Sequence, residues 1–234
     1  MDEKLRQGLN RVYGAPKPVG KAAFLKRHRR RELGRCELVA VQAGYIRLWT
    51  WGASLALFGC ILWGAYQTEA GGLWCAAALT PFLALLAVTE NGRSRLYQME
   101  ELELACRMSR QSVILARMVV LGLFHLALLA GLTPSLAVWG TVGAARAGVY
   151  LLTPYLLTAA LGMELSRRVR SRECLPVCGG AAALVSVMGL LLIYYRPAMY
   201  QQGSLPLWEA ALAAAATAAA VEIRLELTGT EELQ

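Results

Sequence analysis

Charged residues are scarce in this chain of 234 residues. Asp, Glu, Lys and Arg make up only 17% of it, whereas a soluble domain usually carries about 25%. Hydrophobic residues make up 56%, and the mean hydropathy is +0.42. This composition excludes an ordinary soluble enzyme, a disordered chain and a disulfide-bonded secreted module. The polar segments after residue 45 are short, so they leave little room for a soluble catalytic domain.

Residues that bind metals or nucleotides are also few. The only two histidines, His28 and His125, lie far apart, and the pair Cys174 and Cys178 has no second pair to complete a zinc site. The segment 14–22, GAPKPVGKA, has the wrong spacing for a phosphate-binding loop and lacks its hydroxyl residue. We therefore expect no metal, no cofactor and no catalytic residue, and we interpret the six cysteines as free thiols.

Six apolar blocks follow the first 45 residues, each long enough to cross a bilayer as a helix. The sequence thus predicts an all-α polytopic membrane protein with spans at about 46–66, 73–89, 113–132, 135–163, 177–195 and 207–223. This domain, residues 45–225, lies between a basic arm (1–44) and a tail (226–234). The fourth block is too long for one straight span, so we expect a tilted helix or a break near 140–143 or Pro154. The sixth is alanine-rich and weakly hydrophobic.

The positions of the basic residues predict the orientation. Eleven of the 24 lie in the arm, four in each of the loops 90–112 and 164–176, and one, Arg224, just before the tail, whereas the other three loops contain only Arg196. Basic residues collect on the cytoplasmic side of membrane proteins. We expect both termini in the cytoplasm of a multi-pass protein of the plasma membrane, of the bacterial cytoplasmic type. The net charge of +8 lies mostly beside these spans, so we expect no nucleic-acid partner.

The basic arm has a pattern of its own. Leu5, Leu9 and Val12 recur at helical spacing, which favours a short amphipathic helix. Residues 21–35 form a basic run, and such runs beside a span attract anionic lipid headgroups. The alternative is that the arm binds a cytoplasmic regulator.

The loop 90–112 is a candidate docking site. Met99, Leu102 and Cys106 share one face of a predicted short helix, and Ser109 can cap the helix that follows. A short amphipathic helix between two spans is suited to dock on a partner. It could equally lie solvated on the lipid surface.

This loop resembles the cytoplasmic loop of type-2 ABC export permeases. The match, in order, consists of Glu90, Glu101-Leu102, Ser109-Arg110 and Arg117, with departures at Gln98-Met99 and Met108. The resemblance implies a permease that works as a homo- or heterodimer with a separate ATPase subunit. It also implies that the loop contains the coupling helix. The residues concerned are Glu90, Met99, Glu101, Leu102, Arg107, Ser109 and Arg110.

Two ionisable residues lie inside proposed spans. Intramembrane charges and imidazoles are costly, so His125 and Arg146 are candidates for a substrate pathway or gate. The alternative for His125 is interhelical hydrogen bonding, and Arg146 is merely interfacial if its span begins beyond it.

Two other classes of function remain. A membrane sensor or regulator would hold a cytoplasmic partner through the arm. A membrane-embedded enzyme is the least supported, because a convergent set of acids, bases or nucleophiles is missing: Glu100-Glu101 and Arg107, for example, lack the spacing of the intramembrane prenyl-protein proteases.

Overall fold

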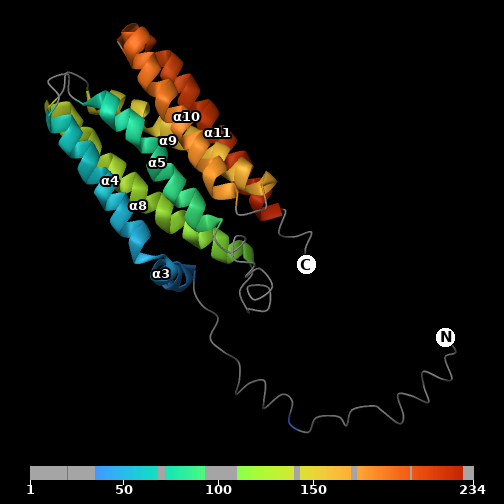
Figure 1. Cartoon of the computed structure of the whole chain (residues 1–234). Coiled ribbons are helices and arrows are strands. Elements are labelled where there is room, and N and C mark those ends of the chain that lie inside the picture. The colour runs from blue at the N-terminus through green and yellow to red at the C-terminus, as the bar shows by residue number, and fades with distance from the viewer. Residues whose placement is uncertain are drawn as a thin grey trace. The chain divides into compact units, whose positions relative to one another are not determined.

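The structure is a computed structural model that describes residue 20 and residues 35–67, 72–92, 110–139, 143–169, 173–200 and 202–228 (Figure 1). The chain divides into two units, Met1–Gly34 and Arg35–Gln234, and the account below concerns the second. The residues described there form helices and no strands. The prediction of an all-α protein is therefore confirmed.

Six long helices form where the sequence has its six apolar blocks. Four of them are long and apolar enough to cross a membrane, α5 is apolar over a shorter stretch, and α11 is not among the four. A short helix, α3 (Arg35–Tyr45), precedes them, and two 3-10 turns, η1 (Pro197–Tyr200) and η2 (Gln202–Ser204), precede the last. The long helices are α4 (Leu48–Gln67), α5 (Leu73–Asn91), α8 (Arg110–Trp139), α9 (Ala144–Arg168), α10 (Cys174–Tyr195) and α11 (Leu205–Thr228).

The boundary between the third and fourth blocks differs from the prediction. We expected spans at 113–132 and 135–163, but α8 continues through Pro134 to Trp139, and α9 begins at Ala144. A proline inside a helix leaves the carbonyl four residues earlier without its N–H partner. Here the hydroxyl of Thr133 donates to that carbonyl, on Ala130, at 2.9 Å. The expected break near 140–143 falls mostly on residues 140–142, outside the described residues, and α9 continues through Pro154.

The helices run back and forth, so their ends gather in two layers. We call the end of the bundle at which α5 ends and α8 begins the loop end, because the segment 93–109 joins the two helices there. We call the other end of the bundle the opposite end. Helix α9 packs against α5, α8, α10 and α11. One apolar cluster joins α4, α5, α8 and α9 (Ile61, Ala65, Ala76, Leu83, Leu129, Leu132, Leu136, Ala147, Leu151), and a second joins α5, α9, α10 and α11 (Val88, Ala160, Met163, Cys178, Ala219).

The outward faces of these helices are apolar as well. Leucines and methionines of α4, α8 and α10 are exposed, among them Leu55, Leu123, Leu184 and Met188. A soluble bundle would present polar residues there. An apolar surface around an apolar core is what a helix bundle in lipid requires.

Candidate functional site

The proposed coupling loop is only partly described by the structure. Arg110 is the first residue of α8, and Glu90 lies in the last turn of α5. The basic run 21–34 lies outside the described residues. So do five of the candidate coupling residues: Met99, Glu101, Leu102, Arg107 and Ser109.

Glu90 joins the loop end of α5 to the first turn of α4. Its side chain is buried, and its Oε2 atom accepts a hydrogen bond of 3.1 Å from the hydroxyl of Thr50, which is buried as well. Thr50 is the third residue of α4. A carboxylate is favoured near the first turn of a helix, where backbone N–H groups are unpaired. The last turn of α5 is therefore fixed to α4 at the point where the loop leaves the bundle.

A second set of hydrogen bonds joins α4, α8 and α9 in the interior. His125 of α8 is fully buried, with 0% exposure. Its Nε2 atom lies 3.0 Å from the hydroxyl oxygen of Ser54 on α4, and its Nδ1 atom lies 3.1 Å from that of Tyr155 on α9. Both ring nitrogens thus have partners on other helices, which is the interhelical bonding considered for His125 from the sequence.

The hydrogen bonds also fix which nitrogen of His125 carries the proton. The single hydroxyl proton of Ser54 is donated to the backbone carbonyl of Thr50 at 2.8 Å. The Ser54 oxygen therefore accepts from an N–H at Nε2. Burial disfavours a charged ring, so in the neutral ring Nδ1 accepts, and the hydroxyl of Tyr155 donates to it.

Arg146 does not share this site. It lies in the first turn of α9, at the opposite end. The α9 partner of His125 is Tyr155, nine residues further on, which is about 13 Å along a helix. The two intramembrane candidates are therefore separated. Helix α9 begins at Ala144, before Arg146, so the interfacial interpretation of Arg146 stays a prediction.

The short helix α3 is attached to α8 near the loop end. The Nε atom of Arg117 donates to Oε1 of Gln42 at 3.2 Å, and Gln42 is buried. Arg117 is also the basic residue that the resemblance placed in the apolar run after the loop. Glu90 and Arg117, on the two helices that flank the loop, are thus bonded to α4 and α3, respectively.

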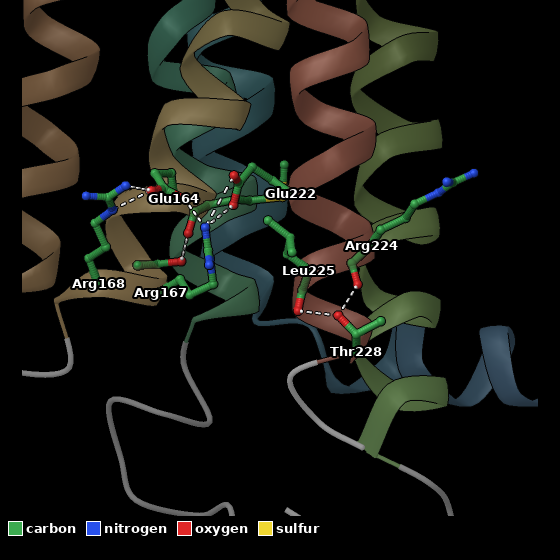
Figure 2. A network of polar contacts seen from close by, with 9 residues as sticks. Glu164, Arg167, Arg168, Glu222, Arg224, Leu225 and Thr228 are labelled. Atoms are coloured by element: carbon green, nitrogen blue, oxygen red, sulfur yellow. Dashed lines mark hydrogen bonds and ion pairs between the residues drawn. The ribbon is translucent and has the colours of Figure 1, made fainter. Parts of the chain in front are cut away.

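Two clusters hold α11 against α9. At the opposite end, the indole N–H of Trp208 donates to the carbonyl of Met199 at 2.7 Å, and the Trp208 ring stacks edge-on against Tyr150. At the loop end, Nη2 of Arg167 lies 3.3 Å from Oε2 of Glu222, and Glu164 pairs with both Arg167 and Arg168 (Figure 2). The two arginines are exposed, whereas the side chains of Glu164 and Glu222 are partly buried. Ion pairs with an exposed partner contribute little to stability.

Three helices contain the same five-residue pattern, Leu-Thr-Pro-x-Leu, which the expectations from sequence did not include. The copies are 79–83 in α5, 132–136 in α8 and 152–156 in α9. The variable residue of the third copy is Tyr155, the partner of His125.

The described residues offer little for metal or redox chemistry. Within them no group of three or more His, Cys, Asp or Glu gathers as metal ligands. Cys60, Cys75, Cys174 and Cys178 are free, in agreement with the interpretation of these four as thiols.

No family model, curated protein or solved structure matches the chain. Its function must therefore be inferred from these contacts and from the resemblance of the loop.

Proposed function

We propose that the chain is the membrane-spanning permease subunit of an ATP-driven, ABC-type exporter. In this proposal the cytoplasmic loop 90–112 couples it to a separate ATPase subunit. The observation that carries the proposal is the hydrogen bond between Glu90 and Thr50. It fixes the point where the loop leaves α5 to the neighbouring helix α4, so a force on the loop acts on both helices.

The other end of the loop supports the same mechanism. The loop enters α8 at Arg110, and two turns later Arg117 is bonded to Gln42 of α3. A displacement of the loop therefore acts on α4 and α5 through one attachment and on α3 and α8 through the other. Alternating access requires such a conversion of an ATPase movement into a relative movement of helices.

The proposal includes an arrangement in the membrane. All six long helices cross the bilayer of the plasma membrane, with both termini in the cytoplasm, and the arm contacts anionic lipid through residues 21–35. The permease works as a homo- or heterodimer. Single cysteines introduced at residues 15, 70, 141, 171, 201 and 231 of a cysteine-free variant test the topology. Residues 70, 141 and 201 should react with an impermeant thiol reagent in intact cells, and the others only after lysis.

The ATPase is tested by purification from the native membrane in mild detergent, followed by mass spectrometry. We expect a stoichiometric ATPase to copurify with the wild type. Glu101→Ala with Leu102→Ala should remove it, because these residues carry the resemblance to a coupling helix. A matched control changes the same residue types in the tail, Glu232→Ala with Leu233→Ala, and should retain the ATPase. No ATPase with the wild type, or loss in both variants alike, would contradict the proposal.

The division of the chain at Gly34 favours one second candidate. Met1–Gly34 and Arg35–Gln234 are two units of the chain, and in this second candidate the arm holds a cytoplasmic partner for a membrane sensor or regulator. Deletion of residues 1–35 separates the two functions. A regulator loses its partner, whereas a permease keeps its ATPase.

A further inference from the structure

The Leu-Thr-Pro-x-Leu pattern places a proline inside each of the helices α5, α8 and α9. Pro81, Pro134 and Pro154 all lie in helix interiors. A proline has no N–H to donate, and its ring crowds the carbonyl four residues earlier. Sharp bends in helices concentrate at such positions. Each of the three helices therefore has one defined place at which it bends most easily.

In α5 and α8 the threonine before the proline compensates for the missing donor. The hydroxyl of Thr80 donates to Ala77 at 3.1 Å, and that of Thr133 donates to Ala130 at 2.9 Å. Both acceptors are the carbonyls that the prolines leave without a partner. In α9 the hydroxyl of Thr153 bonds one carbonyl earlier, on Val149, at 2.8 Å. A side-chain hydroxyl can leave and return by rotation about one bond, which a backbone N–H cannot do.

The leucines of the pattern connect the three bends. Leucines of all three copies belong to, or pack against, the single apolar cluster between α4, α5, α8 and α9. The methyl group of Thr133 also lies beside Gly148 of α9, where an added Cβ atom would be 3.6 Å away. Packed interiors have few voids, so one helix cannot bend here without displacing the others. The leucines concerned are Leu79, Leu83, Leu132, Leu136 and Leu152.

Along α8 the proline lies nearer the opposite end than His125, whereas along α9 the two sites adjoin, because Tyr155 directly follows Pro154. Measured along each helix from the opposite end, the three prolines lie about 8–15 Å deep. Ser54, His125 and Tyr155 lie about 17–21 Å deep, nearer the loop end. Nearer the loop end, the hydrogen bonds of His125 therefore join α4, α8 and α9. Nearer the opposite end, α5, α8 and α9 each contain the proline.

Two neighbouring helices, α4 and α10, lack the Leu-Thr-Pro-x-Leu pattern. Helix α4 contains no proline between Leu48 and Gln67. Helix α10 is bonded to the bend of α5, because the hydroxyl of Ser186 donates to the carbonyl of Ala78 at 2.7 Å. The bend of α5 is thus bonded to α10 from the side.

We propose that the three Leu-Thr-Pro-x-Leu copies form one hinge layer. At this layer the opposite-end segments of α5, α8 and α9 bend together, while the bonds of His125 hold the loop-end segments in place. The hinge gives the bundle two arrangements at the opposite end without disturbing the attachment of the loop. It is a property of the chain alone and does not depend on the ATPase.

Distances between spin labels on the full chain in lipid nanodiscs test the hinge. One pair of labels, at Val138 of α8 and Trp63 of α4, reports on the opposite end, because both side chains are well exposed. A second pair, at Leu115 of α8 and Leu48 of α4, reports on the loop end in the same way. The native cysteines are replaced first. We expect a broad or two-component distance distribution for the first pair and a single narrow one for the second.

Substitutions then assign the movement to the motif. Pro134→Ala with Pro154→Ala restores the two backbone N–H donors. The distance distribution of the opposite-end pair should then become narrow, while that of the loop-end pair is unchanged. Thr133→Val with Thr153→Val removes the two hydroxyls and should broaden the distribution of the opposite-end pair, and Thr133→Ser with Thr153→Ser should leave it as in the wild type. Because the serine and valine variants keep both prolines, they test the hinge even if the alanine variant fails to fold. Equal widths at both ends, or no difference between the serine and valine variants, would overturn the proposal.

Discussion

Gly162 of α9 faces Val88 of α5 so closely that there is no room for a side chain between them. A Cβ atom on Gly162 would lie 2.9 Å from Cγ2 of Val88 and 3.0 Å from its Cγ1. Small residues permit such close approach of helices in membranes. The contact lies two residues before Glu90, so the same stretch of α5 packs tightly against α9 and is bonded to α4.

We expect Gly162→Leu to destabilise the bundle by about 1–3 kcal/mol, because the larger side chain forces α5 and α9 apart. Val88→Ala in the same chain should recover part of the loss. Gly180→Leu is the control, since an added Cβ there meets nothing within 4 Å. Reversible unfolding in bicelles measures all four proteins. Equal effects of the leucine at Gly162 and Gly180 would show that the close contact does not limit stability.

The bond between Ser54 and His125 should appear as a coupling energy. We expect a double-mutant cycle of Ser54→Ala and His125→Phe to give about 0.6 kcal/mol, and at most about 1.7 kcal/mol, the range of hydrogen bonds between membrane helices. The loss of the Ser54 bond to Thr50 occurs in both backgrounds and cancels. Thr217 bonds only its own helix, to Ala214, so a cycle of Thr217→Val with His125→Phe should give no coupling. A coupling energy near zero in the cycle of Ser54 and His125 would show that Ser54 is not the partner of His125.

Glu90 and Thr50 should matter for transmission rather than for docking. We expect Thr50→Val to leave the ATPase bound but to lower its stimulation by the permease about tenfold, since a hydrogen bond to a charged group contributes about 1.5 kcal/mol. Thr89→Val is the matched control, because the hydroxyl of Thr89 bonds Leu86 of its own helix. Copurification and ATPase rates in proteoliposomes separate the two effects. Full stimulation with Thr50→Val would place the transmission route elsewhere.

The contact between Arg167 and Glu222 should contribute little and depend on salt. We expect Glu222→Gln to lower the free energy of unfolding by less than about 1 kcal/mol at low ionic strength, with a smaller loss in high salt. Reversing both charges, Arg167→Glu with Glu222→Arg, should restore part of the loss. Glu209→Gln, at an exposed position of the same helix, is the control. An effect of several kcal/mol would mean that Glu222 has a further role.

The sequence predicted the helices better than their ends. Six apolar blocks became six long helices, because burial of backbone polar groups in lipid leaves little alternative to a helix. The prediction failed where α8 passes through Pro134. A proline usually marks a helix end, and the side-chain bond from Thr133 to Ala130 that compensates for it is a property of the folded chain.

The polar site was predictable only in part. His125 stood out as an imidazole in an apolar block, and Glu90 came from the resemblance of the loop. Their partners, Ser54, Tyr155 and Thr50, are common residue types in membrane helices. Which of them meet depends on the rotation of each helix about its axis, and a single sequence does not give that rotation.

The Leu-Thr-Pro-x-Leu copies, by contrast, were readable from the sequence. They recur at unequal intervals, so a search for a fixed period passes over them. Their meaning required the structure, because only the packing shows that leucines of three separate helices share one cluster.

Helix α3 ends at Tyr45, and α4 begins at Leu48. Only Ile46 and Arg47 connect them, with Ile46 buried, and Figure 1 shows α3 lying at an angle to α4. Two residues span at most about 7 Å, so the connection has no slack. The two helices are therefore closely coupled through Ile46. A shift of α3 therefore acts directly on the first turn of α4, which contains Thr50.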